Sequence, residues 1–535
     1  IEETNPLTGY VTEDQAGNAP NSFESFVGAI TTDLIGQFNY SPVNERPWDY
    51  GYPSFFLQRD VMGQDMALTY TGSWYSPWAY SDYLGPEYIS AQIPMTVYYS
   101  WIKNCNTVIS MYNAAPTERH MSGAGIAYTI RAMLYMDLAQ IYCQKTYIQD
   151  PDGLSAIVVT SETSDYAHNG RSTNREIWED RILADLDEAE ELLAGYTRDN
   201  KYTPDLSVVY GLKARAYLYM GKWELAEKYA KDAQSGYTVM NENQYTSRET
   251  GFNTPNDSWM FGLTFKSNDP CILKNDADSS WGSIMCLEIV PSGGNGCGYA
   301  ANYGHQIAID HHLYNTIPHS DFRRKCFIDF DAANLEGDAL VEFLEDYSDY
   351  AEALAETPVG EDYKFGLGGF SLKFRVAGGD AGHKDQYVGF TMAVPLMRVE
   401  EMKLIEAEAA GMQNEGRGIQ LLTEFAKSRD PQFVYGQHNE QYYGNNTPFQ
   451  NEVWWQRRVE LWGEGFATFD IKRFGKGIIR SYAGTNHVAD YRWNVEGVPQ
   501  WMIFCLGGTD ANYNYALVQN PVPVAPSDDS PEYRF

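Results

Sequence analysis

The sequence has few basic residues and few cysteines, and each shortage excludes a class of protein. Its 39 lysines and arginines stand against 72 aspartates and glutamates, which gives a net charge of −33 and a pI near 4.6. Such a chain offers no basic face to nucleic acid phosphates or to anionic lipid headgroups. Seven cysteines in 535 residues, with no CxxC pair, are too few for a disulfide scaffold and lack zinc-ribbon spacing.

Long apolar runs are also missing. No run of 18 apolar residues is present, so we expect that the chain itself does not span a membrane. The first residues, IEETNPLTGYVTEDQ, show no initiator methionine, basic segment or apolar signal stretch. We interpret this start as a mature or trimmed end, with any lipidation site lying upstream of Ile1.

Catalytic and metal-binding motifs are absent as well. The sequence has no GxSxG, HExxH or Walker A motif, and His305, His311 and His312 lack the spacing of a shared metal site. The stretch 275–280 resembles a calcium loop without the glycine and the distal glutamate of an EF-hand. We expect no enzyme activity and no cofactor, and a structural calcium ion has no support. A glycoside hydrolase stays open as an alternative, because it needs only two carboxylates.

Helical periodicity is strong in two parts of the chain, about 95–235 and 395–480. Apolar residues recur every three or four positions in 130–142, 175–193, 397–411, 418–430 and 452–475. The clearest unit is YGLKARAYLYMGKWELAEKYAKDA (210–233), which has tetratricopeptide spacing, with Tyr217 between two helices and Gly221 at the turn. Such pairs need neighbours to bury their apolar faces. We predict a mostly α fold in which tetratricopeptide-like helical pairs form a scaffold.

Two other stretches, about 40–92 and 236–390, are rich in glycine, polar residues and aromatics and lack helical periodicity. Within the second, SWMFGLTF (258–265) and SIMCLEIV (283–290) are predicted as short strands. We expect a single body of 535 residues with a long irregular, loop-rich segment that carries a few short strands. The two stretches are expected to meet on one face and to form the ligand-binding part.

Aromatic rings are concentrated in SWYSPWAYSDYLGPEY (73–88), where Ser, Gly and Pro separate them. Flat apolar sugar faces stack on Trp and Tyr rings, while sugar hydroxyls bond to polar side chains. Internal packing is the competing explanation for any single Trp, because Trp is usually well buried. The candidate binding residues are Trp74, Trp78, Tyr80, Tyr83, Trp281, Asn295, Tyr299, Asn302 and Tyr303.

Six motifs follow one another along nearly the whole chain. They are GYVTEDQ (9–15), WIKNCNTVIS (101–110), IRAMLYMDLAQIY (130–142), LKARAYLYMGKWELAEKYA (212–230), EMKLIEAEAAG (401–411) and QRRVELWGEGFATFDIKRFGKG (456–477). In this order they resemble the SusD/RagB family. Gln456 and Ala467 depart from the last motif, where an acidic residue and an arginine are usual. Its retained charged residues, which we interpret as structural ion pairs between helices, are Arg457, Arg458, Glu460, Glu464, Asp470 and Arg473.

The resemblance implies a non-catalytic glycan-binding lipoprotein on the cell surface, at the outer membrane of Bacteroidetes-type bacteria. It implies nutrient uptake in which a bound polysaccharide or oligosaccharide passes to a SusC-like TonB-dependent transporter. The only membrane contact would be a lipid anchor on a cysteine upstream of Ile1. Within the binding site, Asp65 and Asp82 are then expected to accept hydrogen bonds from hydroxyls, and Arg375 to donate one.

Two alternatives remain beside glycan binding and hydrolysis. A peptide- or glycopeptide-binding member of the same family would show many exposed apolar pockets instead of flat rings. An intracellular tetratricopeptide adaptor would be built of repeats throughout, whereas one repeat is recognisable here. The acidic composition disfavours sulfated or uronic polymers through like-charge repulsion.

Overall fold

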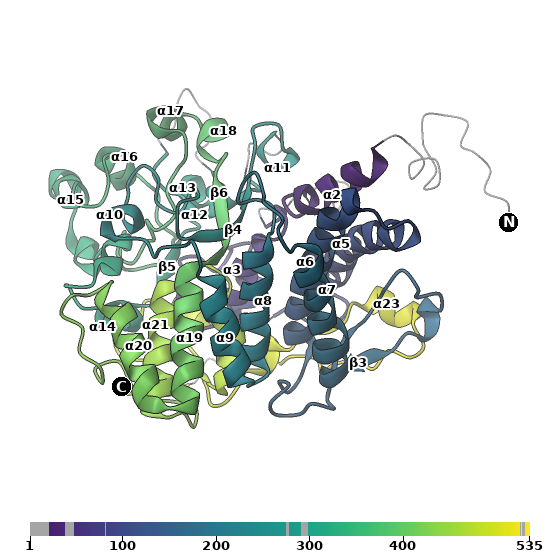
Figure 1. Cartoon of the computed structure of the whole chain (residues 1–535). Helices are drawn as coiled ribbons and strands as arrows, with labels where there is room; N and C mark the ends of the chain where they lie inside the picture. The colour runs from purple at the N-terminus through teal and green to yellow at the C-terminus, as the bar shows by residue number, and fades with distance from the viewer. Residues whose placement is uncertain are drawn as a thin grey trace.

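The computed structural model of the chain describes residues 21–37, 46, 48–80, 82–273, 278–289, 298–524, 526 and 530–535. Its longer helices stand side by side across the lower part of the molecule in Figure 1. These are α5 (Ile89–Ala114), α6 (Glu118–Tyr142), α7 (Ala184–Leu192), α8 (Leu206–Tyr219), α9 (Trp223–Ala233), α19 (Val399–Gln413), α20 (Glu415–Lys427) and α21 (Pro448–Glu460). The shorter α22 (Ala467–Phe474) follows α21 in the sequence. A π-helix, η2 (Glu176–Leu183), leads into α7. The predicted mostly α fold is confirmed.

Short helices of four to eight residues occupy the middle of the sequence, and most of them gather in the upper left part of Figure 1, with α14 lower down beside α20. They are α10 (Glu242–Tyr245), α11 (Pro270–Leu273), α12 (Trp281–Met285), α13 (Tyr299–Tyr303), α14 (His311–Thr316), α15 (Gly337–Leu344), α16 (Ala351–Ala355), α17 (Gly379–Lys384) and α18 (Gln386–Gly389). The N-terminal part adds α2 (Ser22–Asp33), α3 (Ser54–Asp60) and α4 (Ser76–Tyr80), and the C-terminal part adds α23 (Gly508–Tyr513).

The strands are short and form antiparallel pairs. The pairs are β1 (Met66–Leu68) with β5 (Ile307–Ile309), β2 (Leu154–Ile157) with β3 (Arg171–Thr173), β4 (Trp259–Thr264) with β6 (Ala393–Arg398), and β7 (Ile478–Ile479) with β8 (Asn494–Val495). The strand predicted at 258–265 is confirmed as β4. The strand predicted at 283–290 is wrong, because residues up to Met285 belong to α12. The Ser280 hydroxyl accepts a hydrogen bond from the Ser283 N–H and so caps that helix.

The tetratricopeptide-like unit forms as its spacing predicts. Asp205 caps the start of α8, where its carboxylate accepts a hydrogen bond from the Ser207 N–H at 3.0 Å. Gly221 takes a φ of +68° in the turn between α8 and α9, a conformation that favours glycine. Ala214 and Ala226 are fully buried, which allows the two helices to approach closely. Helix α9 then packs against α19, and α19 against α20, so that each pair covers the next.

The helix predicted over 452–475 is interrupted. Helix α21 ends at Glu460 and α22 begins at Ala467, and Gly463 and Gly465 between them have φ values of +79° and +84°. These left-handed conformations favour glycine and allow the turn between the helices, across which Arg457 of α21 lies 2.7 Å from Asp470 of α22.

Among the described residues, no helix has both the length and the apolar character that crossing a bilayer requires.

A network of buried charges joins the scaffold to the middle segment. This central ion network comprises Asp321, Arg323, Lys373, Arg398, Glu400, Arg429, Glu460 and Glu464, four cations and four acids that are all buried. Glu460 is its hub: its carboxylate lies 3.1 Å from a nitrogen of Arg429 and 3.1 Å from one of Arg398. Burial alone would raise the pKa of Glu460, but these arginines and Arg323 outweigh it and hold the pKa below its usual value.

The charged residues of the last motif are confirmed as structural ion pairs. Arg457 contacts Asp470 at 2.7 Å, and Arg473 bridges Asp470 and Glu408. Arg458 instead reaches across the molecule to Asp65 at 2.6 Å. The motif therefore holds distant parts of the chain together.

Candidate ligand-binding site

The aromatic stretch 73–88 is placed by two sets of contacts. Strand β1 pairs with β5, in register Met66↔Ile309, and so brings the following residues beside α13. The Trp74 N–H then donates to the Tyr299 hydroxyl at 3.0 Å. The two aromatic-rich stretches do meet.

The same segment is fastened from the C-terminal side by one buried arginine. The Arg480 guanidinium donates to the backbone carbonyls of Val61, Met62, Gly63 and Ala79 at 2.6–3.0 Å. The Asp60 carboxylate accepts hydrogen bonds from the backbone N–H groups of residues 465 and 467. Buried backbone N–H and C=O groups need hydrogen-bond partners, and these contacts supply them to segments that lack regular secondary structure.

A groove of about 390 Å³ opens beside Trp74. We call it the Trp74 groove; it is lined by Arg46, Trp48, Gly72, Ser73, Trp74, Ser76, Pro77, Trp78, Tyr83, Tyr88, Ile89 and Ser90. The indole of Trp74 is 37% exposed, and the Arg46 guanidinium lies 4.5 Å from its ring centroid. This cation–π contact orients the ring at the surface.

Two tyrosines form the other wall of the groove. Tyr83 is 56% exposed and meets Tyr88 edge to face, with ring centroids 5.1 Å apart. Tyr83 has a φ of +53°, a left-handed conformation that is strained for a bulky residue. Its N–H donates to the Asp82 carboxylate at 2.8 Å, and its carbonyl accepts a hydrogen bond from the Ser90 hydroxyl. These bonds hold an exposed ring in a fixed place.

A second aromatic cluster lies behind Trp74. Tyr299 is buried and packs edge to face on His305 at 4.4 Å, while His305 also contacts the ring of Tyr70 at 4.8 Å. Tyr303, 6.1 Å from Tyr299 between ring centroids, is 56% exposed. Tyr299 is thus the support that links Trp74 to Tyr303, and Tyr303 supplies a further exposed ring.

His305 gives this cluster a dependence on pH. Burial lowers the pKa of His305 from 6.5 to about 4, so in the folded protein it stays neutral down to that pH. In the unfolded chain the His305 imidazole takes up a proton below about pH 6.5. Proton uptake therefore favours the unfolded state, and the stability that the neutral, buried His305 contributes above about pH 6.5 is lost as the pH falls toward 4.

We expect wild type to lose more stability between pH 7 and pH 5 than His305→Gln does. Urea unfolding at both pH values measures this, with exposed His168→Gln as control; equal losses in wild type and His305→Gln would contradict it.

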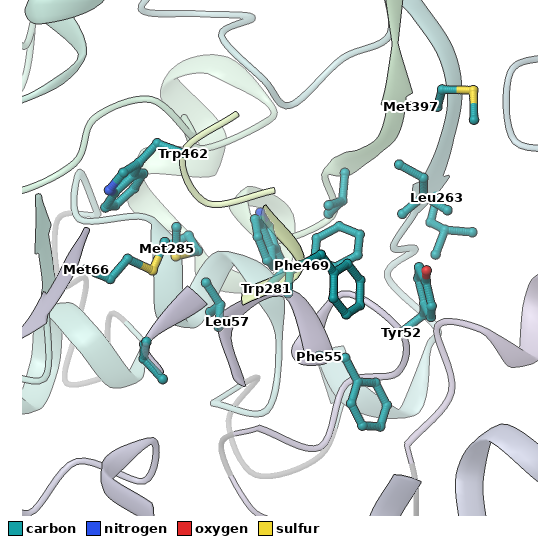
Figure 2. Packing of buried hydrophobic residues seen from close by; sticks show 14 of the residues in the cluster. Tyr52, Phe55, Leu57, Met66, Leu263, Trp281, Met285, Met397, Trp462 and Phe469 are labelled. Atoms are coloured by element: carbon teal, nitrogen blue, oxygen red, sulfur yellow. The ribbon is translucent and has the colours of Figure 1, made fainter. Parts of the chain in front are cut away.

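Two predicted platform rings are not at the surface. Trp78 is 1% exposed and packs against Trp48, and Trp281 is fully buried. The Trp281 indole lies inside the packed core in Figure 2 and meets Phe374 perpendicularly at 5.1 Å. A ring without an exposed face cannot stack on a sugar, so the prediction that Trp281 contacts the ligand is wrong. Trp78 supports the floor of the groove.

Asp65 and Arg375 are also buried, and each has a charged partner. The Asp65 carboxylate is held by Arg458, and the Arg375 guanidinium lies 2.7 Å from Glu288. Freeing either group for a sugar hydroxyl would leave a buried charge unpaired, which is costly. Their predicted roles in ligand binding are therefore replaced by structural ones.

The remaining predicted residues have different environments. Asp82 is half-buried and holds the Tyr83 N–H. Asn302 is exposed but faces a neighbouring hollow of about 650 Å³ that it shares with Glu345 and Asp349. Asn295, the side chain of Tyr80 and residues 275–277 of the acidic loop lie outside the described residues. Within the described part of the chain, no group of three His, Cys, Asp or Glu is placed to hold a metal ion.

Sequence reasoning missed Arg46 and Tyr88. Tyr88 immediately precedes α5, and its placement in the groove depends on where that helix begins. Arg46 has no local pattern that marks it as a partner of Trp74, since the two residues are 28 positions apart, with α3 and β1 between them.

The fold and the groove together define a class of protein, a helical-repeat scaffold that carries a groove with exposed aromatic residues on irregular segments. Comparison with known families agrees with this description. Residues 54–218 match the family model described as "Starch-binding associating with outer membrane", and residues 232–524 match that of the SusD family. The second match alone covers more than half of the 535 residues, so the chain belongs to the SusD family.

Solved structures show the same fold over nearly the whole chain. A SusD-like carbohydrate-binding protein from Bacteroides vulgatus is 22% identical with a TM-score of 0.69, and the match covers 93% of this chain and 97% of that one. Surface glycan-binding protein A from Bacteroides thetaiotaomicron, in complex with laminarihexaose, is 17% identical with a TM-score of 0.65, covering 93% and 98%. A laminarin-binding SusD-like protein is 17% identical with a TM-score of 0.64, covering 96% and 100%. No curated protein matches the sequence significantly.

Proposed function

We propose that the chain is a non-catalytic glycan-binding protein and that neutral sugars bind in the Trp74 groove. The observation that carries the proposal is the set of three exposed rings, Trp74, Tyr83 and Tyr88, which line one groove and are held in place by their neighbours. Aromatic rings fixed before binding lose little conformational entropy when a ligand arrives. Membership of the SusD family and the glycan-binding names of two structural neighbours support the same ligand class.

We further infer that the bound glycan is passed to a SusC-like TonB-dependent transporter at the cell surface. Family membership and the outer-membrane description of the matching family model support this placement. A lipid anchor upstream of Ile1 would hold the protein at the outer membrane. The isolated protein then needs only weak affinity, because a transporter beside it would add further contacts to the same ligand.

Isothermal titration of the purified protein tests the proposal. The panel contains maltohexaose, laminarihexaose, xylohexaose and mannohexaose, the corresponding polysaccharides, and a set of neutral peptides of similar size. We expect saturable, enthalpy-driven binding of at least one glycan and no release of reducing ends after prolonged incubation. Binding of peptides and of no glycan would contradict the proposed ligand class, and released reducing ends would contradict the non-catalytic role.

A further inference from the structure

A second and larger cavity lies along α5 and has none of the lining residues of the Trp74 groove. Its volume is about 950 Å³. One wall is a single face of α5, where Met95, Tyr99, Lys103, Asn106 and Ser110 recur every three or four residues. The opposite walls are residues 157–169 and 509–514, the second of which include α23, a helix that packs against α5 (Figure 1).

The walls of this cavity are tied to one another by side-chain amides. The Asn106 amide donates to the Val159 carbonyl at 3.2 Å, which joins α5 to the segment 157–169. The Asn514 amide donates to the Asn169 carbonyl at 2.8 Å, which joins that segment to the end of α23. The cavity is therefore built before any ligand arrives, as small-molecule sites usually are.

The lining combines apolar surface with many hydrogen-bonding groups and carries no net charge. Most of its residues have side chains that form hydrogen bonds, among them Asn, Thr, Ser and Tyr, and its charged members are Lys103 and Asp510, one of each sign. Burial raises the pKa of Asp510, which is consistent with a sheltered position. In a chain of net charge −33, a charge-balanced cavity with apolar surface and many hydrogen-bonding groups suits a neutral ligand that has apolar faces and hydroxyl groups better than an anion.

Two exposed rings stand at the cavity. Tyr166 is 60% exposed and Tyr513 is 75% exposed, although both belong to its lining. Tyr99 lines the interior and is fixed by a hydrogen bond from its hydroxyl to the Ile157 carbonyl at 2.6 Å. Exposed tyrosines beside hydrogen-bonding side chains offer both contacts that a sugar ring uses, an apolar face and polar partners.

We propose that this cavity is a second carbohydrate site, which takes a neutral oligosaccharide with Tyr166 and Tyr513 stacking on its rings. The Asp510 carboxylate and the Asn169 Oδ1 line the cavity and accept hydrogen bonds from sugar hydroxyls. The Asn106 amide is bonded to Arg131 and to the Val159 carbonyl, so it holds the wall in place. The site shares no lining residue with the Trp74 groove, although both lie along α5. A long glycan that occupies both sites binds with a higher overall affinity, even if the affinity of the Trp74 groove itself is unchanged.

Hydrogen–deuterium exchange with mass spectrometry locates the binding. The wild-type chain and the Trp74→Ala variant are incubated with each neutral hexasaccharide of the panel above, at millimolar concentration. We expect slower exchange in peptides from 157–169 and 508–514 with the bound sugar, in both proteins. Slower exchange in peptides from 73–90 of wild type reports separately on the Trp74 groove.

Substitution of the two exposed tyrosines completes the test. In the Trp74→Ala background, Tyr166→Ala/Tyr513→Ala is expected to weaken residual sugar binding about ten-fold, since two stacking rings are lost. Tyr515→Ala is the matched control, because Tyr515 is 78% exposed, follows α23 and does not line the cavity. Unchanged exchange at 157–169 and 508–514 with every hexasaccharide overturns the proposal, whether or not the groove is protected. Residual binding that survives the double substitution overturns it as well.

Discussion

Replacing Glu460 by alanine is expected to lower the free energy of unfolding by about 3–5 kcal/mol. The carboxylate is fully buried and is shared by Arg429, Arg398 and Arg323. Its removal leaves the central ion network with four cations and three acids in a region without solvent. The cost is therefore that of uncompensated buried charge, beyond the loss of the hydrogen bonds themselves.

Urea unfolding followed by circular dichroism measures this loss. The control is Asp232→Ala, which removes the exposed partner of Lys228 on α9 and is expected to change stability by less than about 0.5 kcal/mol. Glu460→Gln keeps the shape of the side chain and separates the effect of charge from that of packing. An unfolding midpoint of Glu460→Ala equal to that of wild type would show that the network does not hold the fold together.

Trp74→Ala is expected to weaken glycan binding in the groove about thirty-fold, or about 2 kcal/mol, with little change in stability. The ring is exposed enough that its loss creates no cavity in the core, and its contact with Arg46 lies at the surface. Isothermal titration with the best hexasaccharide of the panel measures the affinity. Trp223→Ala on α9, a partly buried tryptophan outside the groove, is the control and should bind as wild type does.

Trp281→Ala is the converse variant. It removes a fully buried indole from the core and is expected to cost about 3–5 kcal/mol of stability. At a temperature where the variant is still folded, its affinity should be close to that of wild type. Normal binding by Trp74→Ala together with lost binding by folded Trp281→Ala would contradict the location of the site.

The sequence predicts the scaffold well because helical periodicity is a local signal. In α8 and α9, the alanine spacing and Gly221 determine the pair without reference to distant residues. The failed strand at 283–290 shows the limit of that signal. Four consecutive apolar residues fit a buried strand as well as a buried helix, and the Ser280 cap that decides between them lies before the apolar run.

Burial of individual aromatic residues is not a local property. Trp74 and Trp281 each directly follow a serine, yet one is exposed and the other lies against Phe374, 93 positions further along the chain. The prediction that Asp65 binds ligand fails for the same reason. Its ion-pair partner, Arg458, is 393 positions away, so the sequence around Asp65 does not reveal that its carboxylate is already paired. Only the tertiary structure decides which polar and aromatic residues remain available for a ligand.

The fastening of residues 60–79 by residues 465–480 determines when the binding face can be assembled. The bonds from Arg480 and to Asp60 span more than 400 positions, so they form only after residues 465–480 have been made. For synthesis at roughly 5–20 residues per second, the segment that precedes Trp74 waits on the order of 20–80 s for its partners. Closing so large a loop is slow compared with forming the local helical pairs. The aromatic face is thus completed late in folding, although Trp74 is synthesised long before Arg480, which fastens its segment.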